Sequence, residues 1–289
     1  MYLTKIKHDF NFTLEDTIDE VLYTLEFNKV SILMPIIFSY SKINFHTNQG
    51  RNTYLLWDVP LFKKKMRYVF VVEGIVKFYW EEGSQRIRYQ YLKGADDRLV
   101  KYWLLHTFLP LYYVLEDIYE ILHVGAISLK GKALLFAAPS FGGKSTLTHY
   151  FLEKGHTLLS DDKLGITKRK EGYYAVPSYP YARNYREVEN LGDHVENFTK
   201  MALPVNVFFH LKKVGPDDEV RVKKVKGYEK FSALEMSHDI KLSSLKQKKF
   251  FSLHDLAQNF TIYELQVPQD INRLEEVYDT ILRTVDETD

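Results

Sequence analysis

The feature that most constrains the fold of this chain is a short loop between a predicted buried strand and a predicted helix. Residues 133–137 read ALLFA, a continuous apolar run typical of a strand that is buried on both faces. The loop APSFGGKST follows at 138–146, and a helix is predicted over about 144–154, ended by Gly155. Another short apolar strand is predicted at 156–160. This strand–loop–helix–strand order indicates an α/β unit.

The loop has the residues that a phosphate-binding loop needs. Backbone N–H groups at a helix start attract an anion, and Gly142 and Gly143 let the backbone approach it closely. Lys144 can reach the β- and γ-phosphates, and the Ser145 hydroxyl is placed for Mg²⁺. The standard pattern has glycine where this chain has Ala138, so an ordinary helix N-terminus remains the alternative. The predicted nucleotide-binding residues are Ser140, Phe141, Gly142, Gly143, Lys144, Ser145 and Thr146.

Two acids, Asp161 and Asp162, come directly after the strand at 156–160. Ligands of parallel sheets lie beyond the carboxyl ends of the strands, so we expect both acids beside the phosphate loop. An acid there can hold Mg²⁺ or accept the proton of an attacking hydroxyl. The alternative is that one of the two acids only caps a turn.

The spacing of these residues resembles the catalytic domain of HPr kinase/phosphorylase, which phosphorylates a serine of the carrier protein HPr. Lys144 lies 21 residues after His123, and Asp161 and Asp162 lie 17 and 18 residues after Lys144, as in that family. The resemblance covers roughly residues 120–210. It implies a P-loop-containing, HPr-kinase-like (PEP carboxykinase-like) α/β catalytic domain that uses ATP and Mg²⁺.

The resemblance also implies a role for each matched residue. Lys144 would bind the transferring phosphates, and Ser145 would ligate Mg²⁺. Asp162 would be the general base on the substrate hydroxyl, with Asp161 beside it. His123 would support that acid or the phosphate. Without the family spacing, a single histidine on a strand is more often a packed or surface residue.

Downstream residues complete the implied site. The family has a metal-binding Glu 43 residues after the lysine, which is Glu187 here, and Glu189 is the alternative because loop lengths drift over that distance. Arg183 and Arg186 lie nearby and could hold a phosphate, or could be surface arginines. The implied metal ligands are thus Ser145, Asp161 and Glu187.

The expected activity is transfer of phosphate to a serine of a peptide or protein. The chain resembles shorter HPr-kinase-related proteins of bacterial gene clusters, including serine kinases that act on the C-terminal residue of lasso-peptide precursors. Ala138 and Phe141 stand where the family has glycines, and the segment linked to the reverse reaction is absent. The alternatives are therefore a small-molecule (amino-acid) kinase and a non-catalytic nucleotide-binding regulatory module, with phosphorylase activity disfavoured.

Composition excludes several other classes of protein. The chain has 289 residues and no cysteine, which excludes disulfide scaffolds, Cys-ligated zinc and thiol catalysis. A formal net charge of +1 gives no electrostatic reason to bind nucleic acid or a membrane. The N-terminus lacks the apolar core of a signal peptide, so a cytoplasmic location is expected. HPr-type kinases are hexamers, so a homo-oligomer is a further expectation.

Two regions are predicted along the chain. Residues 1–120 form a β-rich region of unknown role that ends in a helix, and 121–289 form the catalytic domain. Strands are predicted at 68–79, with Gly74 as a bulge, and at 85–91. The remaining predicted elements are a buried helix at 99–122, or two helices broken at Pro110, strands at 173–176 and 204–211, and a helix at 274–285.

Overall fold

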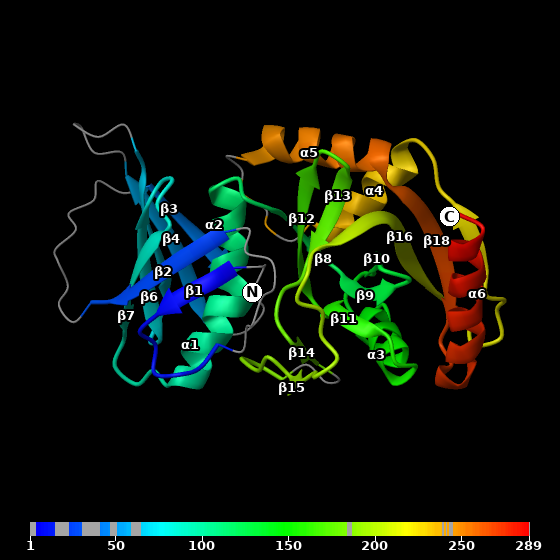
Figure 1. The fold of residues 1–289 in the computed structure, drawn as a ribbon, viewed down its shortest axis with the longest axis horizontal. Coiled ribbons are helices and arrows are strands. Elements are labelled where there is room, and N and C mark those ends of the chain that lie inside the picture. Colours follow the sequence, from blue (N-terminus) through cyan, green and yellow to red (C-terminus); the bar gives the residue numbers. More distant parts are fainter. Residues whose placement is uncertain are drawn as a thin grey trace. The chain divides into compact units, whose positions relative to one another are not determined.

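A computed structural model describes residues 4–14, 23–30, 41–46, 51–58, 65–183, 187–238, 240, 242 and 245–288. The chain forms two compact units (Figure 1). The first consists mainly of Leu3–Glu116 and Arg186–Leu191, and the second mainly of Asp117–Tyr185 and Gly192–Asp289. Both contain sheets and helices, so the chain is a mixed α/β protein. No helix among these residues is long and apolar enough to cross a membrane.

The first unit is built on a seven-stranded sheet, in the order β1-β2-β7-β6-β5-β4-β3. β1 is parallel to β2, and β2 is parallel to β7. The remaining neighbours in the sheet are antiparallel to each other. Its strands are β1 (Thr4–His8), β2 (Tyr23–Lys29), β3 (Ser41–His46), β4 (Asn52–Asp58), β5 (Arg67–Val72), β6 (Val76–Glu81) and β7 (Arg86–Tyr91).

The apolar run at 68–79 forms two strands of this sheet, β5 and β6, instead of one. The prediction of a bulge at Gly74 is wrong, because Gly74 has a φ of +76° and lies in the turn that joins the two strands. A left-handed backbone suits a tight hairpin turn and costs glycine nothing. The strand predicted at 85–91 is confirmed as β7, which is antiparallel to β6.

The helix of the first unit contains a π-helical segment and is shorter than predicted. It consists of α1 (Asp97–Trp103), the π-helix η1 (Leu104–Phe108) and α2 (Leu109–Leu115). The predicted buried helix is continuous through Pro110, so the alternative of two helices broken there does not form. Pro110 lies in the first turn of α2, directly after the π-helical segment, where its missing N–H is tolerated. The predicted extension to 122 is wrong, because Asp117 has a φ of +58° and residues 120–123 form a strand. Phe108 packs this helix on the sheet, with its ring 4.1 Å from that of Phe78.

The second unit is built on a nine-stranded mixed sheet. The strands follow the order β11-β9-β10-β16-β13-β12-β8, and β18 pairs with β16 and β17. The strands of the sheet are β8 (Glu120–His123), β9 (Gly125–Leu129), β10 (Lys132–Ala137), β11 (Thr157–Ser160), β12 (Lys163–Arg169), β13 (Gly172–Val176), β16 (Leu203–Val214), β17 (Val222–Lys224) and β18 (Thr261–Pro268). The other elements are the pair β14 (Tyr181–Ala182) and β15 (Asp193–His194), and the helices α3 (Lys144–Glu153), α4 (Tyr228–Ser237), α5 (Lys246–Asn259), η3 (Ile271–Arg273) and α6 (Leu274–Asp286).

Helices cover both faces of this sheet (Figure 1). On β10, Leu134 and Phe136 belong to an apolar cluster with side chains of α3 and α6. Ala133, Leu135 and Ala137 belong to a second cluster with side chains of α4 and α5. The prediction of a strand buried on both faces is therefore confirmed, as are the strands predicted at 173–176 and 204–211 and the helix at 274–285.

The predicted strand–loop–helix–strand unit is present, with one strand inserted into it. α3 follows β10, and Gly155 ends it with a φ of +89°. β11 does not pair with β10, since β9 lies between them and is antiparallel to both. β10 and β11 consequently run in the same direction, and their carboxyl ends lie at the same edge of the sheet. The loop that follows β10 and the two acids that follow β11 both begin at that edge.

Close packing of α3 on β9 depends on Gly125. A Cβ at this position would lie 2.0 Å from Thr148 Oγ1 and 3.3 Å from Lys144 Cγ. We expect Gly125→Ala to lower the free energy of unfolding by about 2 kcal/mol, the usual cost of overpacking a core. Urea denaturation measures this loss. The double variant Gly125→Ala/Thr148→Ala should recover part of it, and a wild-type midpoint for Gly125→Ala would contradict the contact.

Candidate functional site

The loop between β10 and α3 has a geometry that requires glycine. The Gly142 N–H donates to Pro139 O at 2.8 Å, which closes a turn. A Cβ on Gly142 would lie 2.5 Å from Ala138 Cβ, and Gly143 has a φ of +89°. In the part of the chain that the structure describes, no side chain caps the start of α3. The N–H groups of its first turn are therefore free of a competing side-chain acceptor there.

Phe141 is unusual in this loop. Its φ is +61°, in the left-handed region that favours glycine, and it is 81% exposed. Both the backbone conformation and the exposure of an aromatic ring cost free energy in the isolated protein. Phe141 thus occupies a strained backbone position in this loop.

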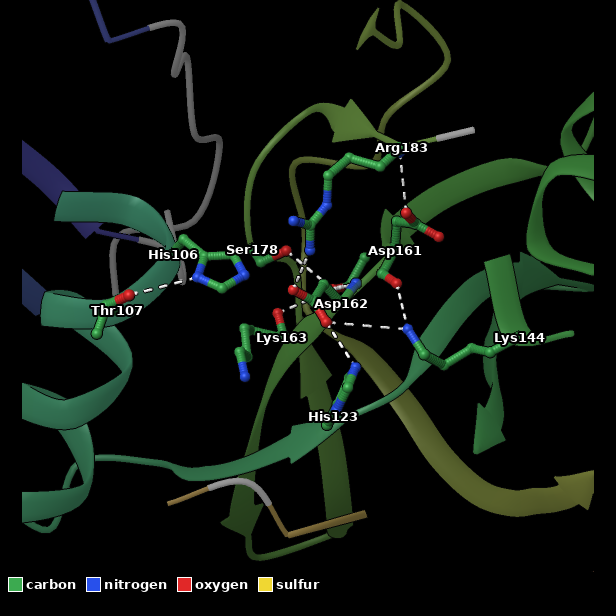
Figure 2. Close-up of polar contacts among 10 residues, drawn as sticks. His106, Thr107, His123, Lys144, Asp161, Asp162, Lys163, Ser178 and Arg183 are labelled. Carbon is green, nitrogen blue, oxygen red and sulfur yellow. Dashed lines mark hydrogen bonds and ion pairs between the residues drawn. The ribbon is translucent and has the colours of Figure 1, made fainter. Parts of the chain in front are cut away.

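Lys144 is the first residue of α3, and its side chain is buried against the two acids (Figure 2). Its Nζ donates to the Asp161 carbonyl at 2.7 Å and lies 3.9 Å from Asp162 Oδ1. Burial lowers the pKa of Lys144, because a charged ammonium is less stable away from water. The lysine and both acids, predicted as neighbours from the sequence, are brought together.

Asp162 lies between two further side chains (Figure 2). It is 5% exposed. Its Oδ1 lies 2.7 Å from His123 Nε2, and its Oδ2 accepts from Arg183 Nη2 at 2.6 Å. The guanidinium of Arg183 and the amino group of Lys144 thus both lie beside this carboxylate.

Sheet register explains why His123 meets Asp162. His123 ends β8 and pairs with Lys163, the first residue of the antiparallel strand β12. Asp162 immediately precedes Lys163, and its carbonyl accepts from the Val124 N–H at 3.0 Å. The spacing of 21 residues from His123 to Lys144 therefore reflects a path through β8, β9 and β10 to the loop.

Two serines that the sequence analysis missed hold the acidic segment in place. Ser160 Oγ donates to Lys163 O at 2.8 Å and accepts from the Asp162 N–H at 3.2 Å. Ser178 Oγ in turn donates to Ser160 Oγ at 3.0 Å. The position of Ser160, at the end of β11 and directly before the two acids, could have indicated its role from the sequence. No local sequence pattern indicates the role of Ser178.

Asp161 is 4% exposed, and its Oδ2 accepts from the Arg183 backbone N–H at 3.0 Å. Burial raises the pKa of Asp161 above its ordinary value of 3.8. The ionised form of Asp161 therefore lowers the free energy of unfolding.

This cost predicts how stability depends on pH. Because the pKa of Asp161 is higher in the folded state, its contribution to stability is present below pH 3.8 and is lost as the pH rises through the folded pKa. Asparagine does not titrate and can still accept from Arg183. We therefore expect Asp161→Asn to raise the free energy of unfolding at pH 7 by on the order of 1 kcal/mol. Thermal denaturation should show that the melting temperature of Asp161→Asn exceeds that of the wild type at pH 7 and that the difference shrinks toward pH 4. A melting temperature of the variant equal to or below that of the wild type at pH 7 would contradict the prediction.

The site offers few side-chain ligands for Mg²⁺. Among the described residues, no group of three or more Asp, Glu or His side chains forms a metal cluster. Mg²⁺ bound with phosphates needs only one or two carboxylates and a hydroxyl, so this finding is compatible with a nucleotide-dependent metal. A buried carboxylate with a raised pKa, such as Asp161, gains from a cation that joins it. The chemistry of Asp161 is therefore compatible with such an ion, and the role of Ser145 as a metal ligand stays a prediction.

The other predicted residues are located differently. Arg186 lies outside the described residues. Glu187 belongs to the first unit, is exposed, and accepts from Asn190 at 2.7 Å, so its metal role stays a prediction. Glu189, the alternative, also belongs to the first unit, where Arg51 and Trp103 bind its carboxylate.

Comparison with known proteins gives a distant similarity. No protein-family model and no curated protein matches the chain. A solved structure of the HPr(Ser) kinase/phosphatase from Coxiella burnetii is similar, with 13% identity over 58% of this chain and 99% of that chain. The TM-score is 0.34.

Proposed function

We propose that this chain is a phosphotransferase that uses ATP and Mg²⁺ to phosphorylate a serine hydroxyl of a peptide or protein. The observation that supports it best is the approach of Lys144, at the uncapped start of α3, to within 3.9 Å of the buried Asp162. A phosphate-binding lysine next to a potential proton acceptor is what transfer to a hydroxyl requires.

Lys144 and the loop would bind the phosphates. The N–H groups at the start of α3 and the Lys144 ammonium carry positive charge toward an anion at the helix N-terminus. Lys144 now donates to a neutral carbonyl, that of Asp161, and a phosphate oxygen is a stronger acceptor. Nucleotide binding would therefore draw Nζ from that carbonyl to the phosphates.

Asp162 would act on the acceptor. The hydroxyl oxygen bonds to the γ-phosphorus, its proton passes to the Asp162 carboxylate, and the bond from the γ-phosphorus to the bridging oxygen breaks to release ADP. Arg183 would stabilise phosphate charge from its position on Asp162. Mg²⁺, when bound by Ser145 and Asp161, would neutralise phosphate charge.

Mass spectrometry after incubation with ATP and Mg²⁺ tests the proposal. The acceptors are a peptide with an internal serine, a peptide with a C-terminal serine and free serine. Phosphate on either peptide supports the proposed activity, and restriction to a C-terminal serine supports the lasso-precursor class. Phosphate on free serine alone would favour an amino-acid kinase. ATP binding by calorimetry without transfer would favour a nucleotide-binding regulatory module.

A further inference from the structure

One short segment of the second unit contacts Asp162 from both of its ends. This segment, residues 178–183, which we call the acid strap, runs from the buried Ser178 to Arg183. Arg183 binds the Asp162 carboxylate, whereas Ser178 reaches Asp162 through the hydroxyl of Ser160. Figure 2 shows both ends of the acid strap beside Asp162. The proposed chemistry uses Arg183 and gives Ser178 no role.

The Ser160 hydroxyl forms every hydrogen bond that a hydroxyl can form. It donates to Lys163 O at 2.8 Å, and it accepts from the Asp162 N–H at 3.2 Å and from Ser178 Oγ at 3.0 Å. One donor and two acceptor sites are the whole capacity of a serine side chain. Both serines are 0% exposed, so solvent supplies no replacement donor. Loss of the Ser178 hydroxyl would therefore leave Ser160 with an unfilled acceptor site.

Ser160 in turn fixes the backbone around Asp162. Its hydroxyl binds the N–H of Asp162 and the carbonyl of the next residue, Lys163. These two groups lie on either side of the Asp162 Cα, so their directions determine where the Asp162 carboxylate points. A hydroxyl that accepts a hydrogen bond is also a stronger donor, because hydrogen bonds in a chain polarise one another. The bond from Ser178 therefore strengthens the bond from Ser160 to Lys163 O.

The acid strap is itself fixed along its length. At its start, the Ser178 N–H donates to Leu159 O of β11 at 3.1 Å. In its middle, β14 pairs with β15. At its end, the Arg183 N–H donates to Asp161 Oδ2 at 3.0 Å. All of these residues belong to the second unit. The Ser178 hydroxyl is therefore presented to Ser160 by a backbone that is bound on both sides of it.

We propose that Ser178 is a positioning residue for Asp162 and acts on it through the Ser160 hydroxyl. Ser178 touches no reacting atom. Its effect on phosphoryl transfer rests on the proposed function of Asp162 as the proton acceptor, whereas its effect on the Asp162 backbone does not.

Hydrogen exchange at the Asp162 amide tests this positioning directly, because that N–H donates to Ser160 Oγ. We expect Ser178→Ala to speed the exchange about fivefold and Ser160→Ala about tenfold, since the amide bond opens more often. The double variant should exchange no faster than Ser160→Ala. The matched control is Ser237→Ala, because Ser237 of α4 is 2% exposed and donates to Leu234 O at 2.7 Å. It removes a buried hydroxyl of the same kind and should leave exchange at Asp162 unchanged.

Three outcomes of the exchange experiment are decisive. Unchanged exchange at the Asp162 amide in Ser178→Ala, or an equal acceleration in Ser237→Ala, overturns the inference. Faster exchange in the double variant than in Ser160→Ala overturns the path through Ser160. Should Ser160→Ala fail to fold, the comparison of Ser178→Ala with Ser237→Ala decides.

Turnover separates the inference from the proposed function. If the wild-type protein transfers phosphate, Ser178→Ala should lower turnover about fivefold and leave the affinity for ATP unchanged. It should add no loss in an Asp162→Asn background, because it acts through Asp162. Weaker ATP binding with wild-type turnover, or additive losses, would overturn the positioning role. Absence of transfer by the wild type would refute only the function, because exchange at Asp162 is measured without substrate.

Discussion

Replacing Lys144 with methionine is expected to reduce phosphoryl transfer by on the order of a thousandfold, the upper range for loss of one charge-stabilising donor. Methionine keeps most of the side-chain volume and removes the ammonium. Lys144 is the first residue of α3, and its Nζ lies 3.9 Å from Asp162 Oδ1. Without the ammonium, the loop loses its closest side-chain charge for the phosphates in both the ground state and the transition state, so ATP affinity and turnover should fall together.

Calorimetry with ATP and a transfer assay measure these two losses. Lys170→Met is the matched control, because Lys170 is an exposed lysine of the same unit, in the turn between β12 and β13. It should retain wild-type binding and transfer. Wild-type affinity for ATP in Lys144→Met would show that the loop does not bind phosphate as proposed.

Replacing Asp162 with asparagine is expected to lower turnover by about a thousandfold, within the range for loss of a general base. The amide oxygen of asparagine can still accept from Arg183, so the site should keep its shape. Asparagine cannot take the proton of the acceptor hydroxyl. The loss should therefore appear in turnover, with ATP affinity changed by no more than a few-fold.

Single-turnover kinetics and ATP titration separate these effects. Asp217→Asn is the control, since Asp217 is an exposed acid in a turn of the same unit. Full transfer by Asp162→Asn would refute the role of Asp162 as the base. Loss of ATP binding without a change in turnover of the bound complex would assign Asp162 to nucleotide binding instead.

The elements around the loop at 138–143 were predictable because their determinants are local. The ALLFA run, the glycines at 142 and 143 and the closing Gly155 each act within a few residues. They defined β10, the loop and α3 correctly. The proximity of Lys144 and the acids followed from strand direction, although the antiparallel strand β9 between β10 and β11 was not foreseen.

The rest depended on distant partners. The strand at 120–123 reads like the end of the preceding apolar helix, and only its pairing with β12 makes it a strand. The contact of Glu189 with Arg51 joins residues 138 positions apart, and Trp103 is 86 positions from the same acid. No local sequence pattern indicates such pairs. The sequence therefore could not distinguish a metal-binding glutamate from one, such as Glu189, whose carboxylate is bound by other side chains.

The connection between β11 and β12 has a consequence for how the protein would work. β11 ends at Ser160 and β12 begins at Lys163, so Asp161 and Asp162 are the whole connection and both neighbours are fixed in the sheet. The backbone of the two acids cannot shift far without breaking strand pairing on one side or the other. If the protein binds a nucleotide as proposed, the backbone at the acids would need little reorganisation, and the larger movements would be those of the Lys144 and Arg183 side chains. Cooling should thus slow binding and release more than the proton transfer itself.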